Sequence, residues 1–146
     1  MAHRVVLDAD WFVINKVKHI KQLAFCSPTL GIYGECTFSL PPGAAAFHLD
    51  LMRQSRHSHG LDWREMGNYR HDEVAKALID IFKKLGTGNL EFFAKGLEKT
   101  RLLQNHLSCP VIDLDSIGCP KYEDLCPHRK TTLQKAVQFG LWLECS

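Results

Sequence analysis

The sequence predicts a single α/β domain, residues 1–146, in which helices cover both faces of one mixed β-sheet. Three observations favour this fold class. Apolar, β-branched segments dominate the first 40 residues, and helical patterns alternate with short strand patterns afterwards. In addition, 146 residues with 45% hydrophobic residues suit one core rather than two.

Three strands are expected in the first 40 residues. Residues 3–14, 19–26 and 33–40 are rich in β-branched, aromatic and other apolar residues. The segment "SPTLG" supplies a turn between the second and third, and "LPPG" ends the third because proline cannot continue a hydrogen-bonded ladder. An antiparallel meander is the expected arrangement.

The remainder alternates between helices and strands. Residues 44–63 begin helically and then enter a polar loop at 57–60, and the clearest helix is 71–85, with Asp72 as its cap and Gly86 at its end. Its apolar stripe comprises Val74, Leu78, Ile81, Phe82 and Leu85. Then come a strand (89–95), a helix (96–107), a strand (109–116) and a helix (131–145), with Leu133, Val137, Leu141 and Trp142 of the last helix facing inward. The resulting order is βββαβαβα.

The first strand carries two acidic residues within an apolar run. Asp8 and Asp10 share one face of the strand, as a pair of metal-binding carboxylates would. The alternative is that the strand ends early and one of them lies in a solvated bend. Asp113 and Asp115 alternate with apolar residues on a later strand, so they either join the first pair or face solvent, and Glu98 could add a further carboxylate.

The cysteines raise a separate question. Six cysteines in a chain with long periodic segments are expected to be reduced thiols, with Cys26 and Cys36 packing in apolar runs. A zinc set of Cys119, Cys126 and His128, completed by Cys109 or Cys145, would be tetrahedral in principle. The spacing C-x6-C-x-H is not a standard zinc pattern, so small buried thiols beside a surface histidine are the alternative.

Charge and hydropathy narrow the classes of partner. The net charge of +2 permits nucleic-acid binding without demanding it. Lys95, Lys99 and Arg101, at the start of a helix, are candidate phosphate contacts or an ordinary solvated face. Histidines 57, 59 and 71 are expected to be solvated loop residues. Without a membrane-span or signal-peptide pattern, we expect an intracellular protein of the nucleus or cytoplasm with no membrane partner.

Several segments resemble one superfamily. The strand order with an acidic pair on strand one, the loop "SRHSHGLDW", the segment "FFAKGLEKTRLL" and the final "HRKTTLQKAVQFGLWL" are similar to the RNase H-like exonucleases. Those enzymes use four acidic residues, and this sequence has Lys99 and Leu133 or a neighbour where two of them would fall. The resemblance therefore implies an RNase H-like fold in which Asp8, Asp10, Asp113 and Asp115 are vestigial catalytic candidates.

A narrower resemblance is to the Maelstrom-type domain, which keeps that fold with a Glu-Cys-His-Cys zinc site. "HSHGLDW", "KGLEK" and "GCPKYEDLCPH" carry it, and Cys126 and His128 match two ligands, whereas Gln22 and Thr131 stand at the other two positions. It implies a module that binds single-stranded RNA, a protein partner or both in small-RNA (piRNA-type) transposon silencing, with structural zinc as the candidate cofactor. The alternative it implies is a ribonuclease of single-stranded RNA that uses Mg²⁺ or Mn²⁺.

Overall fold

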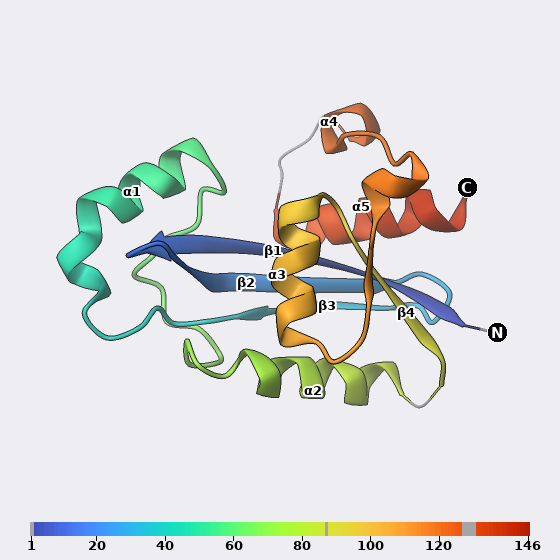
Figure 1. Ribbon diagram of the computed structural model, residues 1–146, viewed down its shortest axis with the longest axis horizontal. Coiled ribbons are helices and arrows are strands. Elements are labelled where there is room, and N and C mark those ends of the chain that lie inside the picture. The colour runs from blue at the N-terminus through green and yellow to red at the C-terminus, as the bar shows by residue number, and fades with distance from the viewer. Residues whose placement is uncertain (1, 87, 127–130) are drawn as a thin grey trace.

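The computed structural model describes residues 2–86, 88–126 and 131–146 and contains one five-stranded sheet in the order β3-β2-β1-β4-β5 (Figure 1). The strands are β1 (His3–Ile14), β2 (Val17–Ser27), β3 (Ile32–Thr37), β4 (Leu90–Ala94) and β5 (Val111–Asp113). The α-helices are α1 (His48–His57), α2 (Val74–Leu85), α3 (Leu97–His106), α4 (Tyr122–Leu125) and α5 (Thr132–Glu144), and the 3-10 turns are Ala44–Phe47 and Leu114–Ile117.

The sheet is mixed, as predicted. β1, β2 and β3 form an antiparallel meander, whereas β4 runs parallel to β1 and β5 runs parallel to β4. The turn between β1 and β2 consists of Asn15 and Lys16, both with positive φ (50° and 65°). Two such residues match the right-handed twist of a tight hairpin, and asparagine tolerates this conformation better than most side chains. The predicted α/β class with a meander and parallel strands is therefore confirmed.

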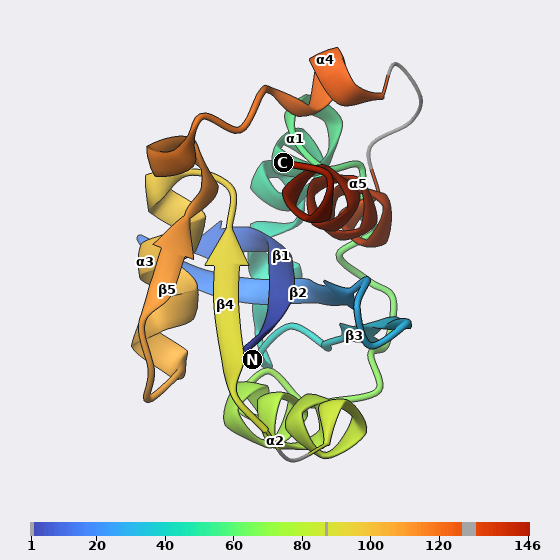
Figure 2. The same cartoon turned by 90° about the vertical axis from the view of Figure 1, so that its right-hand side faces the viewer.

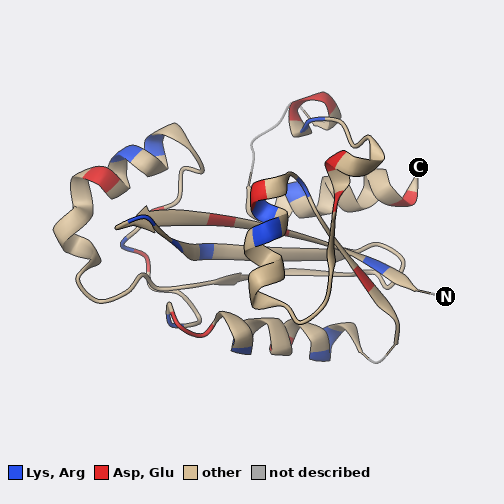
Figure 3. Cartoon of the chain, in the orientation of Figure 1, with Lys and Arg blue, Asp and Glu red and all other residues tan. Residues whose placement is uncertain are grey.

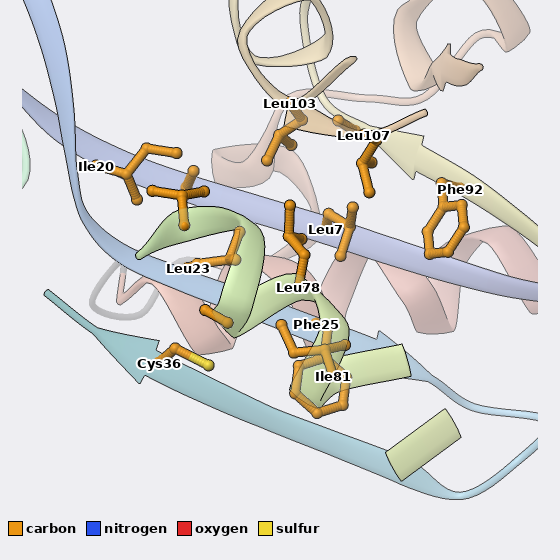
Figure 4. Packing of buried hydrophobic residues seen from close by; sticks show 14 of the residues in the cluster. Leu7, Ile20, Leu23, Phe25, Cys36, Leu78, Ile81, Phe92, Leu103 and Leu107 are labelled. Carbon is orange, nitrogen blue, oxygen red and sulfur yellow. The ribbon is translucent and has the colours of Figure 1, made fainter. Parts of the chain in front are cut away.

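Helices cover both faces of the sheet (Figure 2). On one face, α2 and α3 pack against the strands; Figure 4 shows Leu78 and Ile81 of α2 and Leu103 of α3 around Leu7 and Phe25. On the other face, Phe139 and Leu143 of α5 pack with Val6 and Phe93, and Ala136 contacts Ala24. Val5, Leu7 and Ala9 thus face α2 and α3, while Val6, Asp8 and Asp10 face α5.

The predicted inward stripe of the last helix is only partly confirmed. Leu133, Val137 and Trp142 are half-buried and pack against the core, but the fully buried positions are different ones. Thr132, Ala136, Phe139, Gly140 and Leu143 are buried, whereas Leu141 is 47% exposed. The small residues are the reason, because α5 lies so close to β2 that a Cβ on Gly140 would be 3.3 Å from the Cys26 sulfur. Large side chains on that face would hold the helix away from the sheet.

Two further local predictions need correction. Asp72 does not cap α2; its carboxylate pairs with Arg70 at 2.6 Å, and the helix begins after Glu73. The strand predicted over 109–116 is only Val111–Asp113, because the chain turns into a 3-10 turn whose cap is the Asp113 side chain. In the described part of the chain, no helix is both long enough and apolar enough to cross a membrane.

Candidate functional site

The two aspartates of β1 lie where the sheet changes its connectivity. β4 pairs with β1 only from His3 to Val6, so Asp8 and Asp10 lie beyond the carboxyl end of β4. On its other side β1 continues to pair with β2, opposite Ala24 and Gln22. Ligand sites of open α/β sheets form preferentially at such a point, because strands diverge there and leave a crevice.

A β-bulge follows this point. Asp10 pairs with Gln22 but Trp11 pairs with Ile20, so Lys21 is an extra residue on β2. The Lys21 side chain is buried, and its ammonium group donates to the carbonyl of Phe38 at 2.8 Å and to that of Glu65. The bulge thus fixes the loop beyond β3 against the sheet beside the aspartates.

Asp8 is fully buried and bonded to two lysines. Lys99 Nζ donates to its Oδ1 at 2.6 Å, and Lys135 Nζ lies 3.3 Å from its Oδ2. The second contact is an ion pair without hydrogen-bond geometry. One ammonium group therefore lies against each oxygen of the carboxylate.

Asp10 shares one of these lysines. Lys135 Nζ is 3.1 Å from both of its carboxylate oxygens, and the Thr132 hydroxyl donates to Oδ2 at 2.7 Å. Gln22 Oε1 lies 3.0 Å from the same hydroxyl, and the Gln22 amide donates to Glu35 at 2.8 Å. Basic positions of α3 and α5 and acidic positions of β1 accordingly lie in one region of the molecule (Figure 3).

The burial and the lysines act in opposite directions on the carboxyl pKa values. Burial raises the pKa of Asp8 above its ordinary value, against the opposing charges of Lys99 and Lys135. Burial would also raise the pKa of Asp10, but Lys135, Lys99 and the Thr132 hydrogen bond outweigh it and hold that pKa below its ordinary value. The charges of Asp8 and Asp10 in turn raise the pKa of Lys135 despite its own burial. The cluster is a mutually neutralised set of charges.

The positions of Lys99 and Lys135 are set by where α3 and α5 begin. Lys99 lies in the first turn of α3, which begins directly after Gly96, and Gly96 has a φ of 92° that favours glycine. Lys135 lies in the first turn of α5, whose start is fixed by a capping box in which Thr131 accepts from the Gln134 backbone N–H. Both helices therefore begin at the level of the aspartates, on different layers.

The loop after α1 forms a wall of the site. The His59 Nε2–H donates to the Trp11 carbonyl at 2.9 Å and its Nδ1 accepts from Leu61 N at 3.1 Å, so His59 is a neutral imidazole whose pKa is lowered by burial. The expectation that it is a solvated loop residue is wrong. From α1, the Gln54 amide forms two hydrogen bonds with the backbone of Val13, at 2.7 and 2.8 Å.

The other acidic candidates have local partners. Asp113 Oδ1 accepts from the backbone N–H groups of Gly96 and Asp115, at 3.0 and 2.9 Å, and so caps the turn after β5. Asp115 pairs with Lys95. Glu98 pairs with Lys18 at 3.2 Å.

The three predicted phosphate contacts do not form one face. Lys95 and Lys99 line a cleft beside the aspartates, whereas Arg101 lines a separate hollow with Lys18 and Leu102. Two residues along a helix correspond to about 200°, which turns Arg101 away from Lys99.

The zinc set is only partly described, because His128 lies outside the described residues. Cys119 is buried in the core on the α5 side, where burial raises its thiol pKa, and Cys126 packs at the edge of the same cluster. Cys109 packs against the core on the opposite face, and Cys145 is exposed at the end of α5. Cys109 and Cys119 therefore lie on different layers of the domain.

The carboxylate pair does not fit a divalent metal ion. Mg²⁺ and Mn²⁺ require several free oxygen ligands, but the oxygens of Asp8 and Asp10 already contact ammonium groups or a hydroxyl. Across residues 2–86, 88–126 and 131–146, no three His, Cys, Asp or Glu side chains gather closely enough to hold a metal.

Sequence reasoning did not identify Lys135 or Thr132. Both lie on the inward side of α5, one turn or less from its capping box. The signal that could have found them is the spacing of Thr132, Ala136, Phe139, Gly140 and Leu143, a helical stripe in which small residues replace large ones.

Fold and site together define an α/β domain with a mixed sheet and a buried pair of aspartates neutralised by two lysines. Comparison of the chain with known protein families finds no match, and comparison with curated proteins finds none either.

Proposed function

We propose that this chain is an RNase H-like domain that has lost hydrolysis and acts as a binding module. Its ligand would be single-stranded RNA or a protein partner, in the setting of small-RNA silencing that the resemblance to Maelstrom-type domains suggests. The strand order β3-β2-β1-β4-β5, with an antiparallel meander followed by parallel strands, supports the fold assignment.

One observation supports the proposed loss of hydrolysis. Lys99 and Lys135 each place an ammonium group against Asp8, and Lys135 bonds Asp10 as well. Two-metal hydrolysis needs carboxylates that bridge cations and leave room for a water nucleophile. A tethered ammonium group neutralises the carboxylates but has no coordination site on which to activate water.

A nuclease assay tests this proposal. Labelled single-stranded RNA is incubated with the wild-type chain and with Asp8→Asn, in Mg²⁺ or Mn²⁺ and in EDTA. We expect equal, background-level cleavage in all reactions. Cleavage that EDTA abolishes and that Asp8→Asn lacks would support the metal-dependent ribonuclease instead and would overturn the proposal.

A further inference from the structure

A cleft of about 660 Å³ opens beside the aspartates. The end of β1, the loop after α1, the start of α3, α4 and α5 all contribute to its walls. This volume lies within the range of small-molecule sites in proteins. The cleft is therefore large enough to admit a ligand.

Four lysines and three acids line the cleft. The lysines are Lys95, Lys99, Lys121 and Lys135, and the acids are Asp10, Glu98 and Glu123. Lys135 pairs with Asp10 and Lys18 pairs with Glu98.

The Lys99 side chain is 20% exposed, whereas that of Asp8 beneath it is 1% exposed. An ammonium group has three N–H donors, and Lys99 uses one on Asp8 among the described residues. The buried carboxylate already holds the Lys99 side chain in place. Little of the side-chain entropy of Lys99 is therefore lost when a ligand accepts a hydrogen bond from it.

A second lysine of the cleft has no side-chain partner among the described residues. Lys121, directly before α4, is exposed and lines the cleft. Its carbonyl accepts from the Asp124 backbone N–H, but its side chain makes no hydrogen bond or ion pair with the described residues. Lys95 also lines the cleft, but Asp115 and the Cys119 carbonyl occupy its ammonium group. The free donors of the cleft therefore come from Lys99 and Lys121.

Two aromatic rings of the cleft, those of Trp11 and His59, offer no open face for stacking. Lys18 covers one side of Trp11, 5.3 Å from the ring centroid, and the same ring packs against the core. The His59 ring lies edge-on to Phe12, with 4.5 Å between ring centroids, and both of its nitrogens are bonded to backbone. Base stacking needs an open ring face. Neither ring can stack on a base, which leaves the exposed His57 ring and the lysines as the groups of the cleft that can contact a ligand.

We propose that this cleft binds a phosphate group of a nucleotide or of single-stranded RNA, with Lys99 and Lys121 as the donors. The proposal rests on the proposed function, because Lys99 can donate to a ligand only where no metal takes its place. A lysine ammonium group binds phosphate as a compact point charge. Contacts to phosphate do not distinguish one base from another. Affinity is therefore independent of the base.

The probes are uridine 5′-monophosphate, adenosine 5′-monophosphate and uridine, together with an eight-nucleotide RNA, all measured by calorimetry in EDTA. We expect the two monophosphates to bind with affinities within about twofold of each other and uridine to bind at least about tenfold more weakly, because it lacks the charged hydrogen-bond acceptor. If the RNA binds and the monophosphates do not, the ligand is an RNA strand. If the RNA and the monophosphates all bind, a single nucleotide is sufficient.

Variants of the unpaired lysine connect this binding to the cleft. Lys121→Gln weakens binding about tenfold and Lys121→Arg restores it, whereas Lys83→Gln, on an exposed lysine of α2, leaves it unchanged. For the RNA, Lys121→Gln also lowers the slope of log affinity against log salt by about one. Undetectable binding of every probe, equal binding of uridine and its monophosphate, or wild-type affinity in Lys121→Gln overturns the inference. Metal-dependent cleavage in the nuclease assay overturns the proposed function separately.

Discussion

Replacing Lys135 with methionine tests the charge cluster directly. The change keeps a side chain of similar length but removes the ammonium group 3.1 Å from both Asp10 oxygens and 3.3 Å from Asp8. Removing one partner of a buried ion pair destabilises a protein by about 3–5 kcal/mol, because the remaining charge is left buried. Lys135 is 13% exposed and Lys99 still bonds Asp8, which places the expected loss near the lower end, about 3 kcal/mol.

Urea denaturation at pH 7 measures this loss, and in a chain of this length it corresponds to a fall of about 6–12 °C in Tm. The double variant Lys135→Met/Asp10→Asn is expected to lose about 1–3 kcal/mol less than the sum of the single variants, since it no longer leaves the Asp10 charge unpaired. Lys83→Met, at an exposed position of α2, is the matched control and should change stability by less than about 0.5 kcal/mol. A loss below about 0.5 kcal/mol in Lys135→Met, or strictly additive variants, would refute the reasoning.

Three further predictions concern Asp10, Gly67 and Lys21. Because the pKa of Asp10 is lower in the folded protein than its ordinary 3.8, its stabilising contribution is present above that value and is lost as the pH falls through the folded pKa. The stability advantage of wild type over Asp10→Asn, measured by urea denaturation from pH 7 to pH 3, should therefore shrink towards pH 3. Gly67→Ala places a Cβ 2.4 Å from backbone atoms of Phe38, so calorimetry should show a loss of about 2 kcal/mol; an unchanged Tm contradicts that packing. Lys21→Met leaves the carbonyls of Phe38 and Glu65 without their donor, so amide exchange near Glu65 should accelerate, and unaltered exchange would show that Lys21 does not fix this loop.

The sequence predicted the first four strands of the sheet and the orientation of the acidic pair well. Alternation along a strand is a local rule, so Asp8 and Asp10 could be placed on one face without knowledge of the rest of the fold. The helix phase of α5 was not predictable in the same way, because Leu133, Val137 and Leu141 form a more apolar stripe than the one that is most deeply buried. Close packing against β2 favoured the smaller residues, which is a tertiary effect.

The partners of the site residues were harder to predict than the residues themselves. Asp113 and Asp115 alternate like strand residues, but the chain leaves the sheet at Asp113, where its side chain caps the following turn. His59 lies in a polar segment, and its hydrogen bonds to Trp11 and Leu61 depend on how the loop returns to β1. The contact between Trp11 and His59 joins residues 48 positions apart, so it follows from the complete fold and not from a local pattern.

A manganese titration followed by electron paramagnetic resonance tests the central claim most directly, namely that lysines hold the place a metal ion would need. The wild-type chain and Asp8→Asn are titrated with Mn²⁺ at pH 7, and free and bound ion are counted. We predict no stoichiometric binding tighter than about 1 mM in either protein, because Lys99 and Lys135 already neutralise the carboxylates. One equivalent of tightly bound Mn²⁺ in the wild type, absent from Asp8→Asn, would contradict the account.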